Sequence, residues 1–151
     1  LSTLHTNDAP QTLTRLANMG VAPFNIASSV LLIMAQRLVR RLCRHCRKPD
    51  KIPRRALLVE GYSQQEIDEG LTLYKPVGCE YCYQGYRGRI GIYQVMPISE
   101  AMGRLIMEGG NAIQLGDQAR AEGILDLRQS GLRKVKAGVT SLEEINRVTK
   151  E

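Results

Sequence analysis

The residues with the clearest chemistry are the four cysteines, the only ones in the chain, which fall into two matched pairs. Cys43 and Cys46 form one CxxC motif, Cys79 and Cys82 form the other, and 32 residues separate the two motifs. Two residues between thiols let both sulfurs of a pair face one cation, and two such pairs supply the four thiolates of a tetrahedral Zn²⁺ site. Because four cysteines leave no open position for water, the pattern predicts a structural zinc site rather than a catalytic one.

Three other interpretations of the cysteines stay open at this point. They are unliganded thiols, two disulfides from an oxidising compartment, or a thiol redox protein. The redox interpretation would expect one CxxC at the start of a helix beside a βαβ unit. His45 lies inside the first motif and could compete as a ligand, but we expect a solvated spacer because the thiolates already complete the shell.

Positive charge is concentrated around the first CxxC motif. The chain has 21 basic and 15 acidic residues, a net charge of +6. Nine basic residues and one acidic residue lie between positions 37 and 55, where Arg54 and Arg55 end the basic run. Nearby cations lower cysteine pKa values and offset the charge of a metal tetrathiolate. The run also fits a contact surface for phosphates, acidic lipids or an acidic protein, with a solvated face as the plainer alternative.

Length and composition fit one or two small domains with an aliphatic core. The 151 residues are 43% hydrophobic and include one phenylalanine and no tryptophan. The longest apolar run is too short to cross a bilayer and no signal peptide is recognisable, so the expected location is cytoplasmic. Because the chain starts at Leu1 inside an apparent strand, we expect a fragment of a longer protein.

One strand and two helices are predicted before the first CxxC motif. Residues 1–4 are predicted to form a short buried strand that ends at His5, and a helix follows over residues 9–20. Apolar residues at helical spacing predict a second helix over residues 23–42. Because α/β folds bind ligands at the C-terminal ends of strands, His5 is a candidate phosphate contact, although a lone histidine is more often structural.

Between the CxxC motifs, two short helices are predicted over residues 54–60 and 63–69, and an extended segment over residues 71–74. The second of these helices begins with a capping box at Ser63. The region from Tyr81 to Tyr93 is rich in tyrosine, glycine and arginine. Such a region could stack nucleic-acid bases, but we favour tight packing around the metal.

A strand over residues 89–95 is predicted next, followed by a C-terminal bundle of helices. The helices are expected over residues 97–110, 112–122, 125–138 and from 141 onward. Ser141 and Glu144 have the spacing of another capping box. The predicted class is therefore α+β and mostly helical.

Four segments resemble one family of motor proteins. They are Leu1–Ala9, similar to a histidine box, together with Gln36–Cys43, Gly88–Tyr93 and Gly138–Glu144. The resemblance covers essentially the whole chain in order, and the tetracysteine adds to its specificity. The family comprises the hexameric assembly ATPases of type IV pili and type II secretion. We favour a pilus extension ATPase, because extension motors keep the tetracysteine, whereas retraction motors typically lack it.

The resemblance implies a C-terminal fragment with three parts. Residues 1–42 would be the C-terminal part of a RecA-like ATPase domain, residues 43–96 a zinc-binding subdomain, and residues 97–151 a C-terminal helical subdomain. His5 would face the γ-phosphate of the nucleotide in the full-length motor. The P-loop pattern GxxxxGK[ST] does not occur in this chain. We therefore expect ATP and Mg²⁺ to act only in the full-length protein, and no ATPase activity from this chain alone.

The resemblance also implies partners. The motors form homohexamers and engage an inner-membrane platform protein (PilC-like) from the cytoplasmic side, peripheral to the membrane. A PilZ-type regulator is a candidate partner, with Arg54 and Arg55 as its expected contact residues, and no nucleic acid is expected. The alternative functions are a type II secretion ATPase fragment and a zinc-dependent nucleic-acid-binding module.

Overall fold

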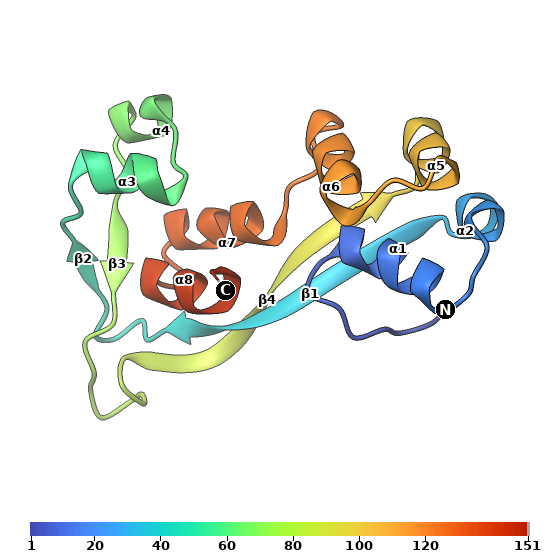
Figure 1. Ribbon diagram of the computed structural model, residues 1–151. Helices are drawn as coiled ribbons and strands as arrows, with labels where there is room; N and C mark the ends of the chain where they lie inside the picture. The colour runs from blue at the N-terminus through green and yellow to red at the C-terminus, as the bar shows by residue number, and fades with distance from the viewer. Residues whose placement is uncertain (151) are drawn as a thin grey trace. The chain divides into compact units, whose positions relative to one another are not determined.

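The computed structural model describes residues 1–150, and the chain forms two compact units. Unit 1 consists of Leu1–Gln36 and Tyr93–Leu127, and unit 2 consists of Arg37–Ile92 and the residues from Arg128 onward. Each unit is built from two stretches that are distant in sequence. The described chain has more helix than strand, which confirms the predicted α+β class (Figure 1). None of the helices within residues 1–150 has the length and apolar character needed to cross a bilayer.

Unit 1 is a helical unit whose core also includes strand residues. Its helices are α1 (Ala9–Asn18), α2 (Pro23–Ser29), α5 (Glu100–Met107) and α6 (Ala112–Ala121). Helices α1, α5 and α6 each begin at a side chain that accepts a backbone N–H of the first turn, namely Asp8, Ser99 and Asn111. Such caps satisfy donors that the helix leaves unpaired. The buried core is formed by Ala9, Leu13, Ile26, Ile33, Met96, Met102, Ile106, Leu115 and Ala119.

Two long strands, β1 (Leu32–Leu42) and β4 (Tyr86–Pro97), pair in a two-stranded sheet. Gln94 of β4 is buried, and its Oε1 accepts the backbone N–H of Ala9 at 3.0 Å. This bond satisfies a donor in the first turn of α1 and fixes that turn on the strand. The residues just after His5 are therefore anchored at the sheet.

Unit 2 contains the remaining elements. They are β2 (Lys48–Asp50), α3 (Arg54–Glu60), α4 (Gln64–Asp68), β3 (Leu73–Lys75), α7 (Leu127–Lys136) and α8 (Leu142–Thr149). Strands β2 and β3 are antiparallel, with Lys48 opposite Lys75 and Asp50 opposite Leu73. The buried hydroxyl of Tyr62 donates to the carbonyl of Leu132 at 2.8 Å, which ties the α3–α4 connection to α7.

Two predictions for the first forty-two residues were wrong. Residues 1–4 form no strand, because within residues 1–150 no strand pairs with them. The predicted helix over residues 23–42 ends at Ser29, and β1 follows. Along β1, Ile33 and Val39 are buried while Leu32, Met34 and Leu38 are exposed. This alternation is typical of a strand, but it is invisible in the hydropathy pattern because both faces carry large apolar side chains.

Most other predicted elements are confirmed. The predicted strand over residues 89–95 lies within β4, and helices α1, α3 and α4 and each of the four expected after Pro97 are present. The capping box at Ser63 is complete. Of the four later helices, α5 and α6 lie in unit 1, and α8 and nearly all of α7 in unit 2. The division into parts at residues 42 and 96 stays a prediction.

Glu144 differs from its expected role at the start of α8. The hydroxyl of Ser141 accepts the backbone N–H of Glu144 at 3.1 Å, as a cap should. The carboxylate of Glu144 does not complete the box, because it accepts the backbone N–H of Arg40 at 2.7 Å and Nε of Arg147 at 2.6 Å. It therefore joins α8 to β1 instead of closing its own helix turn.

Candidate metal centre

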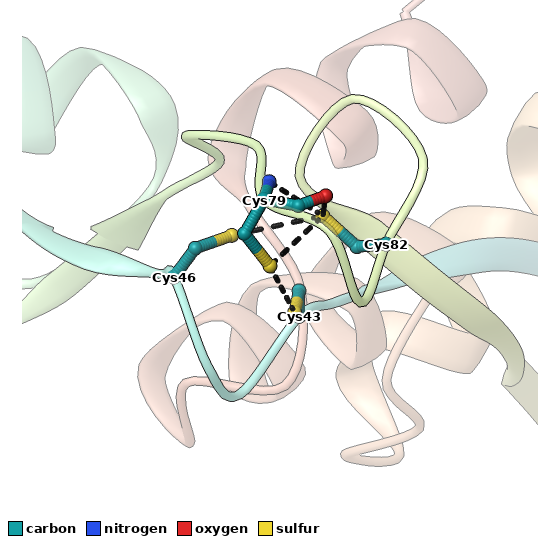
Figure 2. Close-up of side chains that lie close together, drawn as sticks. All are labelled: Cys43, Cys46, Cys79 and Cys82. Atoms are coloured by element: carbon teal, nitrogen blue, oxygen red, sulfur yellow. Dashed lines mark hydrogen bonds between the residues drawn. The ribbon is translucent and has the colours of Figure 1, made fainter.

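The four cysteines meet at one point in unit 2 (Figure 2). The Sγ atoms of Cys43 and Cys79, of Cys46 and Cys82, and of Cys79 and Cys82 are each 3.7 Å apart. All four sulfurs lie within 4.8 Å of one another. A disulfide would need about 2.05 Å, so the thiols are free. Zn–S bonds of about 2.3 Å in a tetrahedron place sulfurs about 3.8 Å apart, and the cluster fits that geometry.

The ends of four strands position the ligands. The first pair lies in the connection between β1 and β2, and the second pair in the connection between β3 and β4. The backbone N–H of Cys43 donates to the carbonyl of Gly85 at 2.9 Å and so joins the two connections. Gly85 has φ +90°, and a Cβ there would lie 2.4 Å from the side chain of Pro76. Only glycine fits here, where the two ends of the β3–β4 connection approach each other.

Two backbone N–H groups point at the sulfurs. Gly78 donates to Sγ of Cys46, and Cys79 donates to Sγ of Cys82, each at 3.3 Å. Donors of this kind stabilise thiolates, which are the form that binds a metal. The surroundings of the sulfurs are therefore prepared for negative charge.

The pKa values of Cys43 and Cys79 indicate how a bound cation would stabilise the cluster. Burial raises the pKa of Cys43. The backbone N–H groups of His45 and Cys46 and the neighbouring thiols lower it by a larger amount, so the result is a pKa of about 7. At Cys79 the backbone N–H of Tyr81 lowers the pKa, whereas burial and the neighbouring thiols raise it to about 12. The first thiolate to form opposes a second negative charge 3.7 Å away. A divalent cation bound between the sulfurs would remove that repulsion.

The aromatic residues around the cluster divide into buried and exposed groups. His45 is exposed, and its ring lies 4.6 Å from the ring of Tyr81 at an angle of 35°. Tyr86 is buried, and its hydroxyl is 2.6 Å from the hydroxyl of Ser141. Tyr83 is 75% exposed. Tyr86 is thus buried against Ser141 and Arg40, and packing of the tyrosines around the metal stays a prediction. His45 contacts the Tyr81 ring and lies outside the group of four cysteines.

Arg54 and Arg55 lie in the first turn of α3, and their surroundings differ. Arg54 forms an ion pair with Asp68 of α4. Arg55 is exposed and forms no ion pair with any described residue. Arg55 therefore has the side chain better placed to meet a partner.

His5 lies in unit 1, whereas the cysteines lie in unit 2. It is exposed and lines a polar pocket of about 610 Å³. One face of α1 contributes Gln11, Thr14, Arg15 and Asn18 to the same pocket. Thr14 Oγ1 itself is buried from solvent and has no hydrogen-bond partner among residues 1–150. No sequence motif marks these residues, although their i, i+3, i+4, i+7 spacing places them on one helix face.

Comparison with known proteins extends over almost the whole chain. The family model "Type II/IV secretion system protein" matches residues 1–147. The chain is 57% identical over 151 residues to the type IV pilus assembly ATPase PilB of Pseudomonas aeruginosa, and 53% identical over 152 residues to that of Acinetobacter baylyi. It is 47% identical over 156 residues to type II secretion system protein E of Dickeya dadantii.

These matches cover 100% of this chain but 26% of the two pilus proteins and 29% of the secretion protein. The chain thus spans little more than a quarter of the length of these relatives. The predicted resemblance to pilus assembly ATPases is confirmed by the matches. With a family model that matches all but its last few residues, the chain belongs to the type II/IV secretion system protein family.

Proposed function

We propose that the chain is part of a hexameric ATPase motor that powers type IV pilus assembly. The observation that carries the proposal is the identity of 57% over all 151 residues to PilB of Pseudomonas aeruginosa. The identity to a type II secretion protein E is lower, 47%, which favours a pilus motor over a secretion motor. ATP hydrolysis with Mg²⁺ belongs to the whole motor, in which residues 1–42 contribute to a RecA-like domain.

Within that motor His5 contacts the γ-phosphate. One feature of its pocket supports this role. Arg15 lines the same pocket and supplies a positive charge. An anionic oxygen in the pocket would pair with that guanidinium.

Residues 43–96 act as a zinc-stapled structural and interaction module. Cys43, Cys46, Cys79 and Cys82 hold the Zn²⁺, which supplies no open position for chemistry. The cation balances four thiolates and fixes the ends of β1, β2, β3 and β4 relative to one another. The module is structural because its ligands complete the metal shell.

The proposed partners follow from the motor. The motor is a homohexamer at the cytoplasmic face of the bacterial inner membrane, where it engages a PilC-like platform protein. A PilZ-type regulator binds at Arg54 and Arg55. Charge supports this surface, because unit 2 holds eighteen of the 21 basic residues and only nine of the 15 acidic ones.

A genetic experiment tests the motor. Deleting the full-length gene should abolish surface pili and twitching motility and leave type II secretion intact. Complementation with the wild-type gene should restore pili, and complementation with the His5→Ala gene should not. A deletion strain that keeps its pili but no longer secretes exoproteins would assign the chain to a secretion motor instead.

A pull-down tests the regulator surface. Arg55→Glu reverses an exposed charge without breaking an ion pair. It therefore tests the contact surface without disturbing the packing of α3 on α4. We expect it to abolish capture of the PilZ-type protein by the full-length motor. Arg133→Glu on α7 is the matched control and should bind normally. Equal capture by wild type and Arg55→Glu would refute this surface.

A further inference from the structure

Arg47 contacts three different segments of unit 2. It follows the second cysteine of the first CxxC motif directly, and its backbone N–H donates to the carbonyl of Cys43 at 3.1 Å. Its guanidinium lies over the ring of Tyr74 in β3, 4.4 Å from the ring centre. Its Nη1 donates to the carbonyl of Gly138, in the turn between α7 and α8. One side chain thus connects the metal-binding segment, β3 and the α7–α8 turn.

The turn is shaped to receive the guanidinium. Gly138 is buried and has φ +77°. A Cβ at this position would lie 2.6 Å from Nη1 of Arg47 and 3.3 Å from ring atoms of Tyr74. Glycine is therefore favoured by the backbone conformation, and a larger residue would have to displace the guanidinium of Arg47 and crowd the ring of Tyr74.

The same turn is also bonded to the end of β1. The backbone N–H of Leu42, the residue before Cys43, donates to the carbonyl of Val139 at 2.8 Å. Thr140 is fully buried, and its hydroxyl donates to the carbonyl of Arg40 at 2.8 Å. The α7–α8 turn is thus bonded to residues on both sides of the first CxxC motif. The backbone of β1 precedes the motif, and Arg47 follows it.

We propose that Arg47 couples the metal centre to the α7–α8 hairpin, so that metal binding and docking of the hairpin strengthen each other. The inference rests on the proposed zinc module. Zn²⁺ bound to Cys43 and Cys46 fixes the backbone that carries Arg47, which reduces the conformational entropy lost when its side chain reaches the turn. Coupling of this kind is reciprocal, so a docked turn tightens zinc binding by the same factor.

Arginine is suited to this position, and lysine is not equivalent. A planar guanidinium can stack on Tyr74 and donate in its own plane to Gly138 at the same time. An ammonium group keeps the charge but loses the planar stack. The charge of Arg47 alone therefore does not explain the contacts.

The test compares zinc-loaded wild-type protein with Arg47→Ala, Arg47→Lys and Lys48→Ala. Lys48 is the adjacent exposed cation, so Lys48→Ala removes the same charge and serves as the control. Chelator competition measures zinc affinity, and hydrogen exchange of residues 127–149 measures docking of the hairpin, each with and without zinc. We expect Arg47→Ala to bind zinc about tenfold more weakly, within the usual range of coupling between sites.

Removal of zinc should accelerate exchange of the hairpin in the wild type. In Arg47→Ala the hairpin should exchange fast even with zinc, Arg47→Lys should be intermediate, and Lys48→Ala should match the wild type. If zinc affinity and hairpin exchange are unchanged in both Arg47 variants, the coupling is refuted while the proposed zinc module stands. A wild type that binds no zinc would overturn the proposed zinc module and this inference with it.

Discussion

The carboxylate of Glu144 accepts two hydrogen bonds from Arg40 through a single oxygen. Its Oε2 lies 2.7 Å from the backbone nitrogen of Arg40 and 2.8 Å from Nε of the same residue. Since the side chain of Glu144 has 0% exposure, the charge is buried and depends on these donors. Arg40 in turn lies 4.3 Å from the centre of the Tyr86 ring, which extends the contact to β4. The start of α8 is thus fastened to both long strands.

Replacing Glu144 by glutamine should destabilise unit 2. The amide keeps the shape of the side chain but removes the charge that pairs with Arg40 and Arg147. We expect the free energy of unfolding to fall by about 2–3 kcal/mol, measured by urea denaturation. Glu143→Gln, an exposed neighbour on the same helix, is the control and should change it by less than about 0.5 kcal/mol. Equal losses in both variants would refute a special role for Glu144.

Stability should fall in acid because of the same carboxylate. Burial raises the pKa of Glu144, but hydrogen bonds from Arg147 and Arg40 lower it by a larger amount. The pKa therefore falls from an ordinary value of 4.5 to about 2. Because the folded-state pKa is the lower one, the stabilisation is complete above about pH 4.5 and is lost as the pH falls to 2. Both arginines are partly exposed, so we expect a contribution of roughly 2 kcal/mol after screening.

The measurement for this pH effect is the difference in unfolding free energy between wild type and Glu144→Gln at several pH values. The difference should be constant from pH 7 to pH 5 and shrink toward zero near pH 2. Taking a difference cancels the loss of metal that thiol protonation causes in both proteins. A difference that does not change with pH would contradict the prediction.

Gly138→Ala should cost more stability than a change in backbone conformation alone. Gly123 has nearly the same φ, +79°, with nothing within 4 Å of its would-be Cβ, so Gly123→Ala is a matched control. We expect about 1 kcal/mol for Gly123→Ala from the positive φ, and at least about 2 kcal/mol for Gly138→Ala. Thermal or urea unfolding measures both. Equal losses would show that Arg47 and Tyr74 yield to the added methyl group.

Cys79→Ser should remove the metal and unfold residues 43–96. Structural zinc sites contribute about 10–16 kcal/mol of apparent binding free energy, comparable with the stability of a whole domain. Elemental analysis should therefore fall from one zinc per chain to near zero, and the melting transition should broaden and move to lower temperature. Glu80→Gln, inside the same CxxC motif, should leave both unchanged. An unaltered melting curve for Cys79→Ser would refute the structural zinc.

A protein consisting of residues 1–151 alone should not hydrolyse ATP. The sequence contains no GxxxxGK[ST], and a lone histidine cannot cradle the phosphates or hold Mg²⁺. A phosphate-release assay with the full-length motor as positive control measures this. Turnover by the isolated chain that disappears in His5→Ala would show that the chain carries catalytic chemistry of its own.

Local chemistry made several features predictable. The caps at Ser63, Ser99 and Ser141 could be read from the sequence because a cap depends on residues within one helical turn. The convergence of the cysteines followed from the spacing within each pair. His5 was named from the sequence as a candidate phosphate contact, whereas no motif marks the residues of α1 that line the same pocket.

The sequence by itself determined the four clustered cysteines, most of the helices and the family, because these depend on residue type and short spacing. Only the tertiary structure decided the rest. Residues 32–42 form a strand because β4, more than forty positions later, supplies its hydrogen-bond partner. The carboxylate of Glu144 bonds to Arg40 instead of to its own helix turn, and Arg47 bonds to Gly138, because folding brings these residues within bonding distance. Contacts between residues about a hundred positions apart leave no local periodicity in a single sequence.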